Sequence, residues 1–108
     1  MASLPIQVVE NTIVKALESG EAIKNGRIRD RWGAGPLREQ YAATLNGDTF
    51  SLRHWGTEIL RLDLDTNTVV RYYGEGNSDR DAVQTALNHF NVSANAHYYP
   101  STDSFVVC

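Results

Sequence analysis

The run Tyr41-Ala-Ala-Thr-Leu-Asn-Gly-Asp-Thr-Phe-Ser-Leu-Arg-His-Trp55 decides the fold of this 108-residue chain. Apolar and polar side chains alternate on both sides of Asn46-Gly47, the period-two pattern of a half-buried β-strand. Asn-Gly between two such runs is the strongest short signal for a β-hairpin, because both central positions of a type I′ turn need positive φ. The run therefore predicts strands over 41–45 and 49–55, joined by a type I′ turn.

The same period continues towards the C-terminus. Gly56 indicates a break or bulge, and residues 57–64 follow as a strand with Leu60, Leu62 and Leu64 on one face. A turn at 65–67 leads to a further strand over 68–73. These strands predict an antiparallel meander of about four strands. Residues 96–99 and 104–107 predict a last hairpin.

Two helices flank the meander. Ser3-Leu4-Pro5 is typical of a helix start, and Gly20 of a helix end. Between them, an apolar face recurs at spacings of three and four, on Ile6, Val9, Ile13 and Leu17. A second helix is predicted over about 78–90, with Ser78 as N-cap and the face Val83, Ala86, Leu87 and Phe90.

Residues 21–25 predict a short turn, and Arg27 to Pro36 predict a loop without periodicity. The chain as a whole predicts one domain, 1–108, of the α+β class, in which the helices pack on an antiparallel sheet. Its apolar share of 42% and charged share of 21% are those of a globular protein and argue against global disorder.

Composition excludes several classes of function. The net charge of −3 is not that of a nucleic-acid binder. The single cysteine, Cys108, rules out a disulfide within the chain and a cysteine zinc site. The first residues lack a signal-peptide pattern, and no apolar run approaches the ~20 residues that cross a bilayer. We expect a soluble protein of the cytoplasm that carries no cofactor and does not act on membranes.

One basic segment stands out, because Arg27, Arg29, Arg31 and Arg38 lie within twelve residues beside Trp32. Three interpretations stay open. The alternating arginines fit a charged edge strand that discourages edge pairing, a partner-binding patch, or a site where phosphates are bound and Trp32 stacks on a base.

The C-terminal half is acidic, with three Lys or Arg against seven Asp or Glu from Trp55 onward. These acids alternate with tyrosines near strand ends and the start of the second helix. Such a surface can bind a basic protein surface. We expect the partner-binding residues to be Glu75, Asp79, Asp81, Tyr72 and Tyr98. Solvated turns explain the same acids without a partner.

Signals for catalysis are weak. His54 and His97 could meet if the last hairpin paired with the second strand of the meander, but no spacing demands a metal. There is no Gly-x-Ser-x-Gly elbow, and Gly74 to Ser78 lacks the lysine of a phosphate loop. We therefore expect no enzymatic activity, no catalytic residues and no metal ligands.

The stretches 54–63, 72–74 and 77–87 resemble a pattern in small uncharacterised proteins of phages and prophages. These stretches hold the aromatic-Gly-Thr strand of Trp55, the Tyr72-Tyr73-Gly74 hairpin end, and the Asn77-Ser78-Asp79-Arg80-Asp81 helix start. The similarity covers roughly residues 50–90 and carries no catalytic motif.

The resemblance implies an anti-CRISPR-like inhibitor of host defence. Its partner would be a host protein of a nucleic-acid-processing defence complex, bound in the host cytoplasm. The alternative from the residues themselves is a small nucleic-acid-binding regulator that uses Arg27 to Arg38. An exposed sheet edge or the tyrosines could also support a homodimer.

Overall fold

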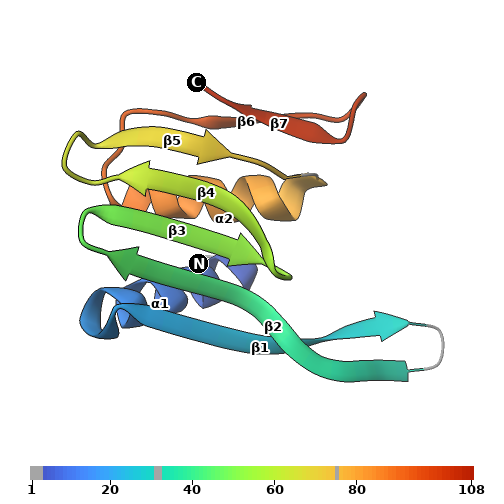
Figure 1. Ribbon diagram of the computed structural model, residues 1–108. Helices are drawn as coiled ribbons and strands as arrows, with labels where there is room; N and C mark the ends of the chain where they lie inside the picture. The colour runs from blue at the N-terminus through green and yellow to red at the C-terminus, as the bar shows by residue number, and fades with distance from the viewer. Residues whose placement is uncertain (1–3, 31–32, 75) are drawn as a thin grey trace.

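The computed structural model describes residues 4–30, 33–74 and 76–108, and it confirms the α+β class (Figure 1). A helix, α1 (Leu4–Ser19), precedes five strands: β1 (Glu21–Asp30), β2 (Gly33–Asn46), β3 (Thr49–His54), β4 (Thr57–Asp63) and β5 (Thr68–Tyr72). A second helix, α2 (Gly76–His89), follows, and the chain ends in a hairpin of β6 (Ala96–Tyr99) and β7 (Ser104–Val107).

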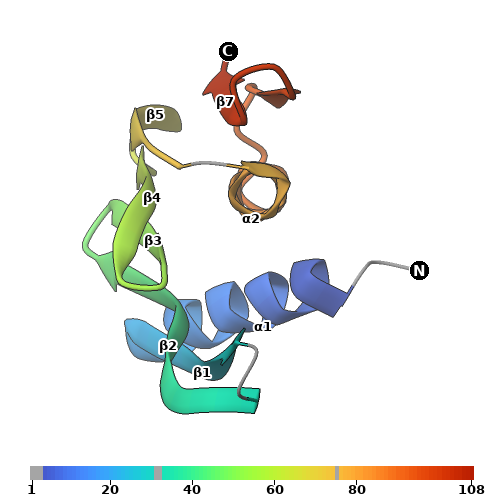
Figure 2. The same cartoon turned by 90° about the vertical axis from the view of Figure 1, so that its right-hand side faces the viewer.

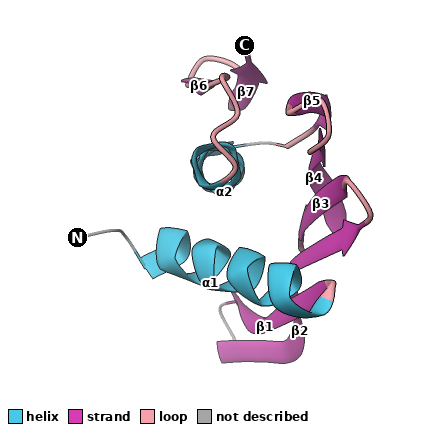
Figure 3. Ribbon diagram, turned by 90° about the vertical axis from the view of Figure 1, so that its left-hand side faces the viewer, coloured by secondary structure: helices cyan, strands magenta, loops and turns pink. Residues whose placement is uncertain are grey.

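The five strands form one antiparallel sheet in the order β1-β2-β3-β4-β5, so β1 and β5 are its edges. The hairpin is a separate two-stranded sheet. Both helices lie on the same side of the five-stranded sheet, and no helix of residues 4–30, 33–74 and 76–108 covers its other face (Figures 2 and 3). The molecule therefore has two layers, with the hairpin beyond α2.

The core lies between the sheet and the helices. Phe50, Leu52, Leu60 and Leu62 are fully buried on the inner face of the sheet, as the alternation of β3 and β4 predicts. Ile59 is buried as well, because a β-bulge opposite Leu52 and Arg53 lets two neighbouring residues of β4 point inward.

Each helix contributes one apolar face to this core. Val83, Ala86 and Leu87 of α2 are buried, as predicted. In α1, Val9 and Ile13 are buried, but Ala16 takes the place expected for Leu17, which is 39% exposed. The spacing 9, 13, 16 follows the helical period as well as 9, 13, 17 does, so the small residue packs against the sheet and the large one faces solvent.

The predicted turn and loop over 21–36 are wrong. Residues 21–30 form β1, and β2 begins at Gly33. The register between the two strands shifts twice, between Lys24 and Asn25 and between Arg27 and Arg29. Pro36 falls at the second shift and has no register partner, which is a position where a strand tolerates proline. The two irregularities interrupt the period-two pattern of the sequence, and for this reason β1 is not predicted as a strand.

The turns also differ from their prediction. The β2–β3 hairpin exists, but its central residues are Gly47 and Asp48, and of these only Gly47 has a positive φ, +61°. This pattern is that of a type II′ turn. A turn with positive φ at both centres lies instead at Trp55 (+51°) and Gly56 (+84°), between β3 and β4. Gly56 is thus part of a tight turn and not a break in the sheet.

Helix α2 begins at Gly76, two residues before the predicted N-cap, so Ser78 lies inside its first turn and does not cap it. The backbone N–H of Gly76 donates to the carbonyl of Asp103 at 3.0 Å. The loop between β6 and β7 thereby satisfies one of the helix's unpaired N–H groups. This contact ties the C-terminal hairpin to the start of α2.

Candidate functional site

A histidine and an aspartate from distant parts of the chain form the most enclosed contact between a basic and an acidic side chain in the described residues. Nδ1 of His54, at the end of β3, lies 2.6 Å from Oδ1 of Asp79, in the first turn of α2. The two side chains are 12% and 15% exposed. An ionised carboxylate can only accept, so Nδ1 carries the proton and donates it to Asp79.

Two aromatic rings hold this histidine in place. The ring of Tyr41 stacks on the imidazole of His54 with centroids 4.4 Å apart and planes 6° apart, and Trp55 lies tilted at 5.8 Å. Tyr41 is 2% exposed. Its burial raises the pKa of its hydroxyl, and the charges of Asp79 and Asp81 raise it further. Together, His54, Asp79 and the two aromatic rings form a cluster that joins the sheet to α2.

The condition under which His54 and His97 could meet, a pairing of the last hairpin with the second strand of the meander, is not fulfilled. The last hairpin pairs with none of the five sheet strands, and His97 is an exposed residue of β6. Over residues 4–30, 33–74 and 76–108, no group of three or more His, Cys, Asp or Glu side chains could hold a metal ion.

The predicted partner-binding residues occupy different environments. Tyr72 is 38% exposed, and its ring lies 5.9 Å from that of Phe105. The hydroxyl of Tyr98 donates to Oδ1 of Asp103 at 2.6 Å, and this hydrogen bond raises the pKa of Tyr98. Asp79 is largely enclosed by its pair with His54, and Glu75 lies outside the described residues.

The backbone packs closely where the sheet meets α2. A Cβ at Gly74 would lie 2.8 Å from Cβ of Asp79 and 2.9 Å from the ring of Phe105. Glycine is therefore required there, and it brings Tyr72, Asp79 and the hairpin into one packed unit. Replacing Asp79 by lysine would disturb this unit as well as any partner contact.

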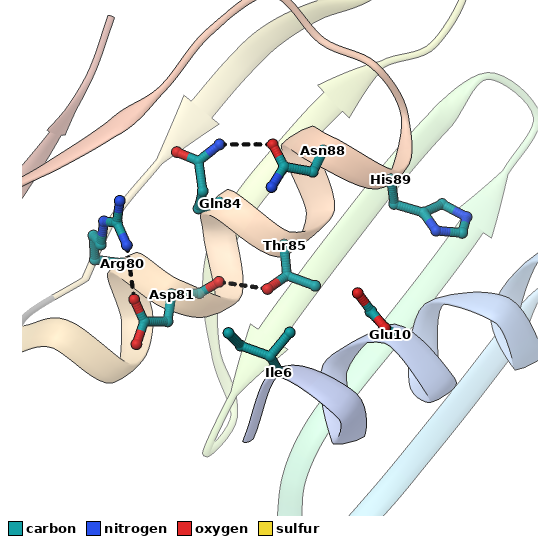
Figure 4. A pocket seen from close by; sticks show the side chains of 8 residues that line it. All are labelled: Ile6, Glu10, Arg80, Asp81, Gln84, Thr85, Asn88 and His89. Atoms are coloured by element: carbon teal, nitrogen blue, oxygen red, sulfur yellow. Dashed lines mark hydrogen bonds and ion pairs between the residues drawn. The ribbon is translucent and has the colours of Figure 1, made fainter. Parts of the chain in front are cut away.

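Asp81 points elsewhere, into a groove of about 260 Å³ between α1 and α2 (Figure 4). We call this the α1–α2 groove. The side chain of Asp81 is 41% exposed and accepts a hydrogen bond from Nη1 of Arg80 at 2.8 Å. Glu10 of α1 points across the same groove towards α2 (Figure 4). Asp81 thus lines the groove between the helices, whereas Asp79 contacts His54.

Large exposed apolar side chains gather at one end of the fold. Eight are exposed in the described part of the chain, and five of them belong to β5, the residue after it, and the hairpin. We use the name tyrosine surface for this set of five exposed side chains on β5, the residue after it and the hairpin: Val70 (57% exposed), Tyr72 (38%), Tyr73 (53%), Tyr99 (50%) and Val106 (39%). The other three, Val14, Leu17 and Ile23, lie on α1 and β1.

The tyrosine surface borders an open strand edge. β5 pairs with β4 on one side, and none of its described residues forms a backbone hydrogen bond with the hairpin on the other. Residues of β5 and β7, among them Val69 and Val107, line a groove of about 410 Å³ between the two sheets. An exposed edge with tyrosines beside it is a surface that a second polypeptide can pair with.

The arginine segment lies on the β1–β2 hairpin. Arg27 and Arg29 are strand positions of β1, an edge strand, and Arg38 is a position of β2 opposite Gly26. The edge-strand alternative for this segment agrees with that placement. Arg31 and Trp32 lie outside the described residues. For Arg27, Arg29 and Arg38 the structure describes the backbone alone.

The sequence gives no signal for the contact between His54 and Asp79 or for the position of Glu10 beside α2. Twenty-five positions separate His54 from Asp79, and no local pattern encodes a contact at that range. Tyr73 and Tyr99 are among the tyrosines that the sequence places beside the acids, although only Tyr72 and Tyr98 are expected there to bind a partner. Glu10 could be found only once α1 and α2 were known to lie side by side.

Comparisons with family models, with curated proteins and with solved structures found no match for this chain. No helix in the described residues is long and apolar enough to span a membrane.

Proposed function

We propose that this chain is a non-enzymatic interaction protein that binds a protein partner through the tyrosine surface. The observation that carries the proposal is the concentration of exposed Val70, Tyr73 and Tyr99 beside an unpaired strand edge. Tyrosine supplies a large contact area at a low cost in conformational entropy, and it is enriched at the centres of protein interfaces.

The narrower form of the proposal concerns the partner. The resemblance of residues 50–90 to phage and prophage proteins supports a host protein of a nucleic-acid-processing defence complex. Such a protein presents a basic surface, which Asp103, the hydrogen-bond partner of Tyr98 beside Tyr99, would complement.

The test is an affinity capture from a host extract with three proteins: the wild-type chain, a Tyr73→Ser/Tyr99→Ser variant, and a Val14→Ser/Leu17→Ser control. The four substituted side chains have similar exposure, between 39% and 53%. The two variants should therefore lower the stability of the fold to a similar extent. We expect one partner that the wild type and the control retain and the tyrosine variant loses. Equal retention by all three proteins would overturn the proposal.

A second function is nucleic-acid binding through Arg27, Arg29, Arg31, Arg38 and Trp32. One observation favours it: β1 and β2 pair and bring the backbone positions of Arg27, Arg29 and Arg38 onto a single hairpin. It predicts binding to single-stranded nucleic acid that weakens steeply as salt rises. A gel shift at low salt with no complex would remove it.

A further inference from the structure

We infer that Asn46 is a site of spontaneous deamidation, in which the side-chain amide is replaced by a carboxylate through a cyclic imide with Gly47. The chain holds two Asn-Gly dipeptides, Asn25-Gly26 and Asn46-Gly47. Asparagine is a thermolabile residue, and a following glycine favours the reaction because it has no Cβ to obstruct ring closure. The structure places the two dipeptides in different settings, which should make their rates differ.

The reaction needs only water and hydroxide. Hydroxide removes the proton from the backbone nitrogen of Gly47, and this nitrogen attacks Cγ of Asn46. A bond between these two atoms forms, the bond between Cγ and Nδ2 breaks, and Nδ2 takes a proton from water and leaves as ammonia. Water then adds to one of the two ring carbonyls and breaks its bond to the nitrogen. Opening at Cγ gives aspartate, and opening at the main-chain carbonyl gives isoaspartate.

The groups that react at Asn46 are not held by the protein. Asn46 is the last residue of β2 and is exposed. Within residues 4–30, 33–74 and 76–108, no hydrogen bond holds its side-chain amide, and the backbone N–H of Gly47 donates to no partner. The attacking nitrogen and the carbon that it attacks can therefore meet without the loss of a hydrogen bond of their own.

The turn leaves room for the ring. A Cβ built at Gly47 would meet nothing within 4 Å, so the space beside its nitrogen is open. Asn46 and Thr49 form the last register pair of β2 and β3 before the turn. The backbone of Asn46 can therefore rotate towards the ring geometry once this single pair opens, and the ends of paired elements open at a low free energy.

Asn25-Gly26 serves as the internal comparison, because it lies within the pairing of β1 and β2. Gly26 is paired with Arg38, and further register pairs lie on both sides, at Lys24 and at Arg27. Ring closure there requires the backbone to leave the sheet between neighbouring pairs, which is an opening of higher free energy. The same dipeptide should therefore react slowly in the strand and fast at the turn.

The product should weaken the β2–β3 hairpin. Isoaspartate lengthens the main chain by one carbon next to the turn, where the carbonyl of Asp48 accepts the N–H of Leu64 at 2.7 Å. Both products also place a new negative charge two residues before Asp48. We therefore expect the deamidated chain to unfold at a lower urea concentration than the fresh chain.

The experiment incubates the full chain at mildly alkaline pH, folded and, in parallel, unfolded in urea, and follows both dipeptides by peptide mapping with mass spectrometry. In the unfolded chain, Asn25 and Asn46 should react at similar rates, which gives the intrinsic rate of each. In the folded chain, Asn46 should stay within about fivefold of its unfolded rate, and Asn25 should react at least about tenfold more slowly than when unfolded. Isoaspartate at position 46 would show that the ring has formed, because direct hydrolysis of the amide gives aspartate alone.

Asn46→Gln is the matched variant, since glutamine keeps the amide but must close a larger ring, which forms much more slowly. It should give no product at position 46 and should keep its urea midpoint during an incubation that lowers the midpoint of the wild type. Equal protection of both asparagines by folding, a faster reaction at Asn25, or aspartate without isoaspartate at position 46 would overturn the proposal. An equal loss of stability in Asn46→Gln and the wild type would overturn the expected effect on the hairpin.

Discussion

The imidazole of His54 and the carboxylate of Asp79 lie 2.6 Å apart, and they join the end of β3 to the first turn of α2. Tyr41 stacks on the same imidazole from β2. Asp79 also packs against Gly74, which precedes α2, and so towards Phe105 of the hairpin. The contact between His54 and Asp79 therefore joins the sheet to the second helix, and Gly74 lies close to both Asp79 and Phe105 of the hairpin.

Asp79→Asn should destabilise the fold by about 2 kcal/mol, because it replaces the charged acceptor of an enclosed hydrogen bond with a neutral one, and hydrogen bonds to charged groups contribute about 1.5–3 kcal/mol. Asp81→Asn is the matched control on the same helix, and its exposed pair with Arg80 should contribute less than about 1 kcal/mol. Urea unfolding of both variants measures the difference. Equal small losses would show that the His54–Asp79 contact adds nothing to stability.

We expect the protein to be less stable in acid than at neutral pH, because protonation of the Glu58 carboxyl removes a stabilising contribution. Burial raises the pKa of this carboxyl, but hydrogen bonds from Ser51 (2.7 Å) and Arg61 (3.0 Å) and the charges of Arg61 and Arg71 lower it further than burial raises it. The folded state therefore favours the ionised form. The resulting stability is present above the ordinary pKa of 4.5 and is lost as the pH falls below it.

Glu58→Gln tests this directly by chemical unfolding at several pH values. The variant should be less stable than the wild type at pH 7, and the difference should shrink as the pH falls below 4.5. Glu18→Gln, an exposed position on α1, should change stability little at pH 7. A wild-type advantage over Glu58→Gln that stays constant into acid would contradict the assignment.

Two glycines should respond differently to alanine. At Gly56 a Cβ meets nothing within 4 Å, so only the φ of +84° is strained, and Gly56→Ala should cost about 1–2 kcal/mol. At Gly74 the Cβ would enter the packing around Asp79 and Phe105, so Gly74→Ala should cost about 3 kcal/mol or more. Thermal unfolding of the two variants measures both losses of stability. A larger loss in Gly56→Ala than in Gly74→Ala would mean that the packing around Gly74 relaxes easily.

The sequence predicts the fold class, both helices, four sheet strands and the last hairpin, because each has a clear hydrophobic period. β1 and the first half of β2 escape prediction, since the register shifts near Asn25 and Ile28 and the glycines around Pro36 imitate a loop. The Asn46-Gly47 signal identifies the hairpin, but the strand pairing moves the turn one residue on, to Gly47 and Asp48.

Candidate sites are harder to predict than strands. Tyr72 and Tyr98 lie near the exposed tyrosines, whereas Asp79 and Asp81, two positions apart on one helix, point to different places. Helical geometry separates them, and only the packing of α2 against β3 on one side and α1 on the other determines which one is enclosed. Such contacts depend on the tertiary arrangement and leave no trace in a local pattern.

The face of α1 offers a simple check on that packing. Ile13→Ala should cost about 2–4 kcal/mol, because Ile13 is fully buried, and Leu17→Ala should cost less than about 1 kcal/mol, because Leu17 is 39% exposed. The midpoints of urea unfolding compare the two. A larger loss at Leu17 would mean that α1 packs with its predicted face and not with Ala16 inward.

The most direct test of the central claim is the affinity of the purified partner for the wild-type chain and for the Tyr73→Ser/Tyr99→Ser variant, measured by calorimetry. If the tyrosine surface is the binding site, the variant should lose affinity by about thirtyfold or more, as the truncation of interface tyrosines does, while the Val14→Ser/Leu17→Ser control keeps it. An unchanged affinity in the tyrosine variant, or an equal loss in the control, would contradict the account.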